Sequence, residues 1–454
     1  MEKFKILEAM EKIKYEKPSI SKINAGMPSK FGLPVKQKVI SEIDGIKVSK
    51  LIEEYGSPLF VISEKTIREV FADAKRAFEN RYPKVQFAWS YKTNYLDAVC
   101  SIYHDEGSWA EVVSGFEFEK ALSNGVNGSQ ILFNGPDKSE ADLTMAIENN
   151  ACIHIDHFDE LYLLIETSRK LQKKARVAIR VNLDAGVYPI WDRFGFNYEN
   201  GDAWNAINRI MLAENLDLIG LHTHIGTYIM AQTAYAIAAS KLANLYMAIH
   251  RKFDYWLKYI DLGGGFASKN TLKGAYMPGN ETCPSFDEYA EAISNALISS
   301  EIPHENLPVL FLETGRALID DAGYLLTTVI ANKRLNSGRR SMVIDAGVNL
   351  LFTSFWYNLG VYPTRELGHA EESTIYGPLC MNIDVVRDAI VFPQVKTGEQ
   401  LVIERVGAYN ITQSMQFITY RPNVVLIDME GKTHIIRKKE SLETFKQAEE
   451  NPKR

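Results

Sequence analysis

The segment VQFAWSYKTN, residues 85–94, begins with the pattern of a β-strand and carries a lysine near its end. Alternate residues of a strand point to opposite faces. One face of this segment carries four large side chains: Val85, Phe87, Trp89 and Tyr91. The other face carries Gln86, Ala88, Ser90 and Lys92. The small side chains of Ala88 and Ser90 leave room beside Lys92, so we expect its ammonium group to point into an open space.

Seven further short apolar segments follow, and segments with helical periodicity lie between them. The apolar segments are WAEVVS, QILFNG, CIHID, ARVAIRVN, LDLIGLHTHIG, DYWLKYIDLGGG and PVLFLETG. Eight strand–helix units over roughly 230 residues indicate an α/β fold of the TIM (β/α)8 barrel type. A doubly wound open sheet is the alternative, although such sheets usually have fewer strands.

The segments on either side of the predicted barrel differ from it in pattern. Residues 320–454 are rich in strand patterns such as SMVIDAG and EQLVIERVGAY, which predict an all-β, Greek-key-like domain. A hairpin turn is expected at Asp44-Gly45 and a helix cap at Ser63. The expected division is an N-terminal extension at 1–35, strands joining the β-domain at 36–60, the barrel at 61–319 and the β-domain at 320–454.

Composition excludes several classes of protein. The 454 residues are 46% hydrophobic and 24% charged, as in ordinary globular proteins. A net charge of −6 without a basic stripe argues against nucleic acid as a partner. No apolar run reaches membrane-spanning length, and the charged start lacks a signal-peptide core. The four cysteines form no CxxC pair, which fits a cytoplasmic location.

Polar residues gather where the predicted barrel strands end, and active-site groups of TIM barrels come from these strand ends. They are Lys92, Glu111, Ser114, Asn134, Asp156, Arg180, His224, Gly263–Gly265 and Glu313. The glycines of DLGGGF offer backbone donors to an anion, and barrels commonly bind phosphate after strands seven and eight. A tight turn is the alternative interpretation. Arg316, just after the eighth strand, is a natural second phosphate ligand.

A phosphate site, a lysine in an open space and a carboxylate on a neighbouring strand together suggest pyridoxal 5′-phosphate. Lys92 would form a Schiff base with this cofactor, and Glu313 would keep the pyridine nitrogen protonated. A buried lysine–glutamate salt bridge is the alternative, although burying such a pair is costly without further partners.

The motif LHTHIG places His222 and His224 on the same face of a strand. Such a pair can bind a metal ion, but no HExxH-type acidic pattern accompanies it. We therefore expect His224 to stack on the cofactor ring, His222 to be structural, and no metal to be bound. Ser114 and Glu117 have the spacing of a capping box, which is expected to mark only a helix start.

In their joint order, these motifs resemble the fold-type III pyridoxal-phosphate decarboxylases, which have the alanine racemase-like fold. The chain is most similar to the diaminopimelate decarboxylase branch and more distantly to the ornithine decarboxylases. The resemblance runs from about Gly56 to Ile427. It is carried by SYKTN, AEVVSGFE, RFGF, GLHTHIG, DLGGGF, ETGRALIDDAGYLL, IDAGVN, GPLCMNID and GAY.

The resemblance implies a role for particular residues. Lys92 would be the Schiff-base lysine, His224 would stack on the ring and Glu313 would pair with the ring nitrogen. The implied phosphate site comprises Thr227, where the family often has serine, with Gly263, Gly264, Gly265, Gly315, Arg316 and Tyr409. Glu111 and Arg180 would form a supporting ion pair. The enzyme would be a homodimer in which Cys380 enters the other subunit's active site and protonates the substrate.

Two positions depart from the family pattern. Met381 follows the cysteine, where the diaminopimelate enzymes have glutamate and the ornithine enzymes aspartate. Thr353 stands where the diaminopimelate enzymes carry an arginine for the distal carboxylate, and threonine cannot replace its bidentate contact. The expected substrate pocket comprises Thr353, Tyr357, Met381 and Asp384. This remodelling suggests a different or larger substrate, such as a conjugated amino acid.

The sequence therefore predicts the α-decarboxylation of an amino acid or an amino-acid conjugate. Diaminopimelate decarboxylase proper is one alternative. An amino-acid racemase is another, although racemases of this fold typically place arginine at the ring nitrogen. A metal-dependent hydrolase using His222 and His224, and a non-catalytic pyridoxal-phosphate carrier, are further alternatives. Known carriers of this fold lack the β-domain.

Overall fold

Eight parallel strands close into a barrel in the computed structural model, which describes residues 38–187 and 189–452. They are β4 (Val85–Ser90), β5 (Trp109–Val112), β6 (Ile131–Phe133), β7 (Cys152–Ile155), β8 (Ala175–Asn182), β10 (Leu216–His222), β11 (Tyr259–Asp261) and β13 (Val309–Leu312). Neighbouring strands pair in parallel, and the pairing of β8 with β10 closes the ring. The predicted α/β barrel is confirmed, with the eight strands in the eight expected segments.

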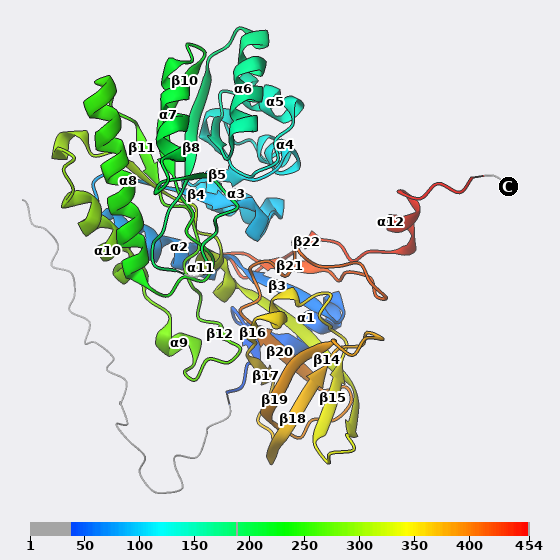
Figure 1. Cartoon of the computed structure of the whole chain (residues 1–454). Coiled ribbons are helices and arrows are strands. Elements are labelled where there is room, and N and C mark those ends of the chain that lie inside the picture. The colour runs from blue at the N-terminus through cyan, green and yellow to red at the C-terminus, as the bar shows by residue number, and fades with distance from the viewer. Residues whose placement is uncertain (1–37, 188, 453–454) are drawn as a thin grey trace, which may run out of the picture. The chain divides into compact units, whose positions relative to one another are not determined.

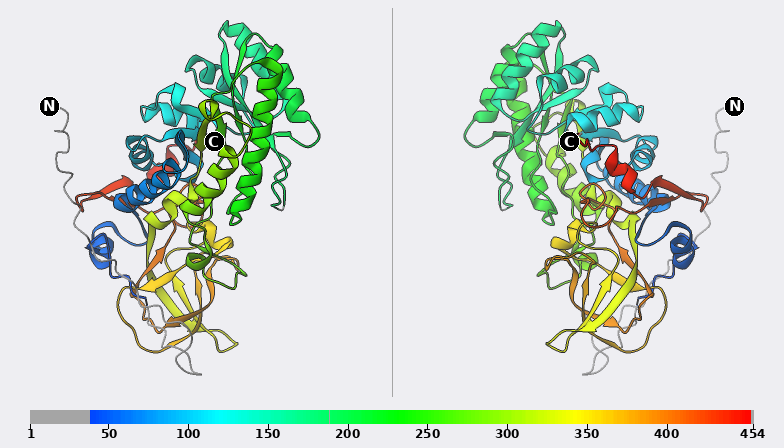
Figure 2. Two further views of the ribbon diagram at one scale, coloured as in Figure 1. Left: turned by 90° about the vertical axis from the view of Figure 1, so that its left-hand side faces the viewer. Right: turned by 90° about the vertical axis from the view of Figure 1, so that its right-hand side faces the viewer.

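Helices alternate with these strands and lie on the outside of the barrel (Figure 1). They are α2 (Glu64–Glu79), α3 (Asp97–Asp105), α4 (Gly115–Ser123), α5 (Glu140–Glu148), α6 (Phe158–Leu171), α7 (Asp202–Leu212), α8 (Gln232–Phe253), α10 (Phe286–Ile298) and α11 (Arg316–Ile319). Helices α8 and α10 pack side by side (Figure 2). The predicted cap of α2 is confirmed, because the Ser63 hydroxyl accepts a hydrogen bond from the Thr66 amide at 3.0 Å.

One end of the barrel interior is filled by apolar side chains. Seven different strands each contribute one buried residue to a single cluster: Ala88, Leu132, Cys152, Ala178, Ile219, Tyr259 and Phe311. Trp109 of the remaining strand, β5, packs against this cluster. We call these eight residues the apolar floor. Because the floor fills the barrel as packed core, any ligand has to bind at the C-terminal end of the strands.

The C-terminal part of the chain is rich in β-strands, as the sequence predicted. Its strands are β14 (Gly323–Arg334), β15 (Arg340–Ile344), β17 (Val361–Pro363), β18 (Ala370–Tyr376), β19 (Val385–Pro393), β20 (Gln400–Glu404), β21 (Val424–Ile427) and β22 (Thr433–Arg437). Strand β3 (Leu59–Ser63) lies between β14 and β21 in the order β19-β18-β15-β14-β3-β21-β22. Two pairings, β15 with β18 and β3 with β21, are parallel.

The segment before β3 differs in part from the expected strands. The hairpin at Asp44-Gly45 is present as β1 (Glu42–Ile43) and β2 (Ile46–Lys47), which form a separate two-stranded sheet. Residues Val48–Tyr55, however, form the helix α1. Val48 and Leu51, one helical turn apart, are both buried, and this spacing fits a helix rather than a strand. The expected extension at 1–35 lies outside the described residues.

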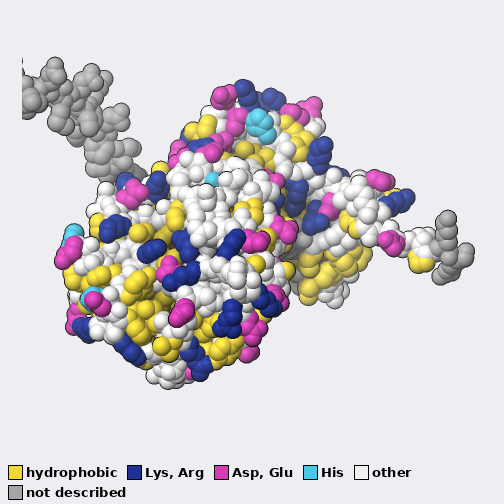
Figure 3. All heavy atoms as spheres, turned by 90° about the horizontal axis from the view of Figure 1, so that it is seen from above, with side chains coloured by type: hydrophobic (Ala, Val, Ile, Leu, Met, Phe, Trp, Pro, Cys, Tyr) yellow, Lys and Arg dark blue, Asp and Glu magenta, His cyan; other side chains and the backbone are white. Residues whose placement is uncertain are grey.

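The remaining elements are short: β9 (Phe196–Asn197), β12 (Thr271–Leu272), β16 (Tyr357–Asn358), α9 (Gly279–Thr282) and α12 (Leu442–Lys446). Over the described residues, no helix combines the length and the apolar character needed to cross a lipid bilayer. On the face seen in Figure 3, basic and acidic side chains are interspersed.

Candidate active site

A layer of polar side chains lies above the apolar floor. Side chains of a strand return to the same face every second residue. Two residues beyond the floor residues, the strands therefore present Ser90, Glu111, Asn134, His154, Arg180, Asp261 and Glu313. On β10, an irregular register between Leu218 and Gly220 puts His222 in line with Arg180. The side chains that point into the barrel thus change from apolar to polar or ionisable over two residues of each strand.

Lys92 lies just beyond this layer. The alternating pattern had suggested that Lys92 lies on the strand. The strand β4 ends at Ser90, however, and Lys92 is in the 3-10 turn Tyr91–Thr93. Its Nζ donates to Glu111 Oε1 at 2.7 Å and lies 2.5 Å from Oε2. Burial alone would lower the pKa of Lys92, but the charge of Glu111, with contributions from Tyr409 and Glu313, raises it above its ordinary value. Lys92 is therefore an ammonium at neutral pH.

The second carboxylate, Glu313, is buried beside the same space. Asn134 joins the two acids, because its Nδ2 donates to Glu313 Oε1 at 2.7 Å and to Glu111 Oε1 at 3.0 Å. Glu313 Oε2 lies 3.2 Å from His222 Nε2, but neither atom has a hydrogen bond among the described residues. Burial and the charge of Glu313 raise the pKa of the neighbouring Asp261 well above its usual range. Glu313 thus offers one oxygen to a further donor.

The sixth barrel strand ends at His222, and His224 follows two residues later. Burial, followed by the charge of Arg180, lowers the pKa of both His222 and His224 well below its ordinary value. Both line the same cavity. His224 accepts a long hydrogen bond of 3.3 Å at Nδ1 from the Gly226 amide. Neutral imidazoles can stack on an aromatic ring without adding charge beside it.

Glycines and one arginine form the other end of the site. A side chain at Gly264 or Gly265 would lie within 2.7 Å of backbone oxygen atoms, so only glycine lets the chain approach this closely. The Arg316 guanidinium lies 4.6 Å from the Tyr409 ring centre, and its buried Nη1 has no hydrogen-bond partner in the described chain. Tyr409 has a φ of +63°, an uncommon backbone conformation for a non-glycine residue. This end of the site offers donors to an anion.

The cavity enclosed by these groups has a volume of about 360 Å³, within the usual range for small-ligand pockets. Its walls contain most of the predicted cofactor residues: Lys92, Glu111, Arg180, His224, Thr227, Gly264, Gly265, Glu313, Gly315, Arg316 and Tyr409. Gly263 adjoins the wall, where its amide donates to Asp261 at 2.8 Å. Residues distant in sequence therefore meet in one pocket.

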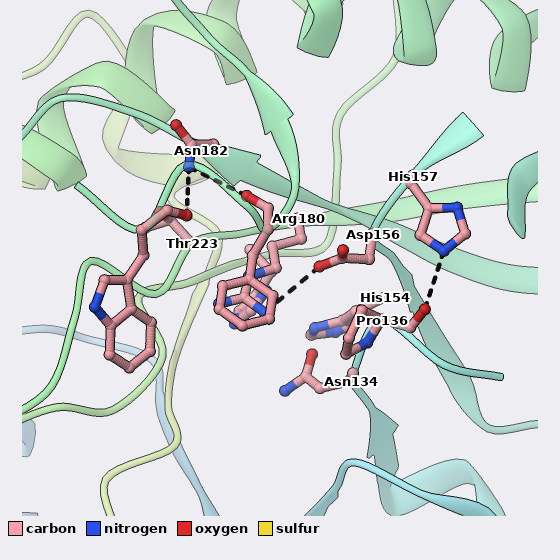
Figure 4. Close-up of polar contacts among 12 residues, drawn as sticks. Asn134, Pro136, His154, Asp156, His157, Arg180, Asn182 and Thr223 are labelled. Carbon is pink, nitrogen blue, oxygen red and sulfur yellow. Dashed lines mark hydrogen bonds and ion pairs between the residues drawn. The ribbon is translucent and has the colours of Figure 1, made fainter. Parts of the chain in front are cut away.

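The expected ion pair between Glu111 and Arg180 does not form. Glu111 contacts Lys92, and Arg180 instead lies 3.5 Å from Asp156 (Figure 4). Strand order explains this difference. Lys92 follows β4, the neighbour of β5, and Asp156 follows β7, the neighbour of β8, whereas two strands separate β5 from β8.

The predicted substrate residues are more dispersed. Thr353 lines the cavity, and its hydroxyl donates to Asn410 Oδ1 at 3.0 Å. Tyr357 is buried, and its ring centre lies 5.4 Å from the Arg316 guanidinium. Asp384 is also buried, and its carboxylate accepts bonds from the Val348 and Leu379 amides, which fixes the loop after β18. Cys380 and Met381 belong to that loop, and Cys380 is exposed. Neither belongs to the cavity wall formed by their own described chain.

Several wall residues were not predicted. Trp191 and Phe194 come from the loop between β8 and β9, and Gln413 comes from the β-rich region. No period-2 pattern marks these positions, because they lie outside the barrel strands. Asn134 does follow such a strand, but its bridge between two carboxylates depends on the closed ring.

A metal-binding alternative involves other residues than the sequence suggested. Ligand atoms of His154, His222, Asp261 and Glu313 lie within 4.8 Å of one another, whereas His224 is not part of this cluster. All four side chains are buried in the polar layer. His154 donates to or accepts from the Tyr259 hydroxyl at 2.7 Å, so part of the cluster is already satisfied by protein groups.

Comparison with known proteins identifies the family. Residues 65–320 match the family model described as pyridoxal-dependent decarboxylase, pyridoxal binding domain. The chain belongs to this family. It is an enzyme, a carboxy-lyase that depends on pyridoxal phosphate.

Several relatives carry the name diaminopimelate decarboxylase. The chain is 29% identical over 417 residues to the diaminopimelate decarboxylase of Bacillus subtilis, covering 88% of this chain and 93% of that one. It is 29% identical over 412 residues to the Aquifex aeolicus enzyme of the same name, covering 88% and 93%. The crystal structure of diaminopimelate decarboxylase from M. jannaschii superposes with a TM-score of 0.83 at 28% identity, covering 90% and 96%. The same enzyme in complex with L-lysine gives 0.82 at 27% identity, with the same coverage.

The residues of the site fit pyridoxal phosphate. The glycine backbone and the unpaired Arg316 Nη1 supply donors at one end, where a phosphate would be held. Glu313 Oε2, also unpaired among the described residues, matches a protonated ring nitrogen at the other end. Lys92 stands between acidic groups and faces the cavity.

Proposed function

We propose that this enzyme removes the α-carboxylate of an amino acid or amino-acid conjugate. The distal end of this substrate is not a carboxylate, because no arginine stands at position 353 to bind one. The observation that carries the proposal is Thr353, which lines the cavity with its hydroxyl and amide both directed to Asn410. Three cationic side chains are found in the described cavity wall: Lys92, Arg180 and Arg316. The first two face Glu111 and Asp156, and the third stands at the glycine end.

The geometry supports a role for each residue of the site. Lys92 would attach the cofactor through its amine, Glu313 would hold a proton at the ring nitrogen, and His224 would stack on the ring. Gly264, Gly265, Gly315, Arg316, Thr227 and Tyr409 would hold the phosphate, and Gly263, whose amide donates to Asp261, would shape the turn beside it. Bound in this way, pyridoxal phosphate supplies an electron-accepting ring that stabilises the electron pair left when carbon dioxide departs. Glu313 strengthens that effect because its negative charge favours the protonated ring nitrogen.

Cofactor loading should accelerate with rising pH. The amine of Lys92 must lose its proton before it can form a bond, and its raised pKa keeps the deprotonated fraction small at neutral pH. The loading rate of cofactor-free protein should therefore rise continuously from about pH 7 to about pH 9. Stopped-flow absorbance measures this rate. The control is Glu111→Gln, which removes the main cause of the raised pKa and should shift the profile to lower pH. A flat or falling profile would contradict this role of Lys92.

Diaminopimelate decarboxylase proper is the second candidate. It is favoured by the names of the relatives. The alignment with this chain covers more than nine-tenths of the length of each of these relatives. A racemase is less well supported, because the residue at the ring-nitrogen end of the site is the carboxylate Glu313.

A substrate panel separates these candidates. Carbon dioxide release would be measured with meso-diaminopimelate, lysine, ornithine and amino acids conjugated at their distal amine. We expect a conjugate or an amino acid without a distal carboxylate to give the highest kcat/KM. In Thr353→Arg, kcat/KM for meso-diaminopimelate should rise by about tenfold, since an arginine–carboxylate pair is a strong contact. Highest activity of the unaltered enzyme with meso-diaminopimelate would favour the second candidate and refute our proposal.

We further propose a homodimer with shared active sites. Three neighbouring loops expose large apolar side chains: Phe355, Trp356, Ile383, Met415, Phe417, Ile418 and Tyr420. The loops are joined, because Asp384 accepts from the Val348 amide at 2.8 Å and the Met415 amide donates to Asn349 at 2.9 Å. Such a patch is typical of a protein interface. Cys380 lies in one of these loops, so in a dimer Cys380 of the partner subunit would protonate the substrate α-carbon.

Mixing two inactive variants tests this arrangement. Lys92→Ala and Cys380→Ala, unfolded and refolded together, should recover about one quarter of the wild-type activity, because half of the dimers contain one intact site. Each variant refolded alone is the control. Mixed protein that stays as inactive as the two controls would mean that Lys92 and Cys380 act within one chain.

We also propose that the protein is located in the cytoplasm. The basis for this proposal is that its four cysteines are unpaired.

A further inference from the structure

The loop between β8 and β9 is fastened over the site by one buried amide. Asn182, the last residue of β8, donates from Nδ2 to the carbonyl oxygens of Trp191 at 2.7 Å and of Phe194 at 3.1 Å (Figure 4). Its Oδ1 accepts from Asn197 Nδ2 at 3.2 Å. Asn182 is 7% exposed, so these bonds are formed out of water. The side chain therefore fixes both ends of the segment from Trp191 to Phe194.

The close approach of this loop to the barrel depends on a glycine. Gly195 has a φ of +77°, and a Cβ there would lie 2.7 Å from the Arg180 carbonyl oxygen. Beside it, the Phe194 ring centre lies 4.5 Å from the Arg180 guanidinium, a cation–π contact. The loop is thus held against the polar layer at a second point.

These contacts place Trp191 against His224. The two ring centres are 5.3 Å apart with an angle of 21° between the planes, which is an offset-stacked arrangement. Both rings line the cavity. Burial lowers the pKa of the His224 imidazole well below its usual value, which disfavours an ion pair, and its hydrogen bond with the Gly226 amide is long, at 3.3 Å. The indole is therefore a contact that can define the plane of the imidazole.

We propose that Trp191 is a positioning residue that holds the His224 imidazole in the plane needed to stack on the pyridoxal ring. Asn182 in turn holds Trp191. The inference rests on the proposed role of His224 and adds to it a residue that acts through the imidazole. A ring that is already oriented loses less freedom when the cofactor binds, so its contact contributes more to affinity.

A double-mutant cycle on cofactor binding tests the proposal without using activity. The dissociation constant of pyridoxal phosphate would be measured by absorbance titration of cofactor-free protein for Trp191→Ala, His224→Ala and the double variant. We expect Trp191→Ala to weaken binding about three- to tenfold, and to have almost no further effect once His224 is alanine. Trp191→Phe should restore most of the affinity, because it keeps a stacking ring.

Trp204 provides a matched control. It lies on α7, where its ring is 6.3 Å from that of Phe253 and is not part of the cavity wall in the described chain. Trp204→Ala should leave cofactor binding unchanged, and circular dichroism checks that each variant is folded. Equal effects of Trp191→Ala with and without His224, or no effect at all, would overturn the proposal.

The same titration separates this inference from the proposed function. If His224→Ala binds the cofactor normally while Lys92→Ala loses its covalent attachment, the stacking role and the Trp191 proposal both fail but the site assignment stands. If the unaltered protein does not bind pyridoxal phosphate, the proposed site itself is wrong. Asn182→Ala is a further check, since it should weaken binding in the same direction by loosening Trp191.

Discussion

Replacing Lys92 by alanine will abolish the visible absorbance of the bound cofactor and lower carbon dioxide release by at least about 10³-fold. Lys92 is the cavity-lining lysine of the described chain, and its amine lies beside two carboxylates that face the same space. Without this amine the cofactor has no covalent attachment and is not returned to its starting position after turnover. Absorbance spectra and carbon dioxide release on the same preparation measure both effects.

The matched control is Lys92→Arg. Arginine keeps a positive charge beside Glu111, so the buried acid stays paired and the fold is preserved, yet its guanidinium is not a nucleophile at any pH of interest. We therefore expect Lys92→Arg to be as inactive as Lys92→Ala and to melt close to the unaltered protein. An active Lys92→Arg enzyme would show that another group carries the cofactor.

Glu313→Gln should lower kcat by about 10²- to 10³-fold while cofactor affinity changes much less. Glutamine has the shape of glutamate and can still accept a bond from Asn134, which now donates to Glu313 Oε1 at 2.7 Å. It cannot, however, supply the negative charge that keeps a proton on the ring nitrogen. The loss therefore falls on the chemical step. Single-turnover decarboxylation and cofactor titration distinguish the two effects.

Glu117→Gln is the control for this second experiment. Glu117 is another buried glutamate near the site, and burial together with the charge of Glu111 raises its pKa to about 7. It accepts a bond from the Val113 amide at 2.9 Å, which glutamine can also accept. Its replacement should change kcat by no more than about threefold. An equal loss in both variants would indicate that general disturbance of the polar layer, and not the charge at Glu313, causes the effect.

The barrel could be predicted because its inward-facing side chains repeat every second residue. The same repeat placed Glu111, Arg180 and Glu313 correctly at one end of the strands. On β4, however, the alternating pattern predicted a strand that continues to Lys92. The strand ends at Ser90, and Lys92 lies in the 3-10 turn that follows. The confirmed helix cap at Ser63 shows that a hydrogen bond between residues close in sequence can be predicted from the sequence.

The pairing of charges was not predictable in the same way. The ion pair expected between Glu111 and Arg180 requires side chains from strands β5 and β8, which are not neighbours. Lys92 follows β4, which pairs with β5, and Asp156 follows β7, which pairs with β8. Helix α1 was missed because a short amphipathic segment after a hairpin has no clear start signal; Lys47 makes no side-chain cap. Trp191 was missed because it belongs to a loop, where contacts and not periodicity define position.

The apolar floor and the polar layer are built from the eight strands, whereas Thr353, Trp356 and Gln413 reach the cavity from outside the barrel. Part of the cavity wall is therefore encoded outside the barrel, in the same stretch of the gene as Tyr409. Under the proposed function, substitutions at Thr353, Trp356 and Gln413 would change substrate preference while the barrel strands that position Lys92 and Glu313 stay unchanged. A combinatorial library confined to those three codons is the direct way to redirect this enzyme.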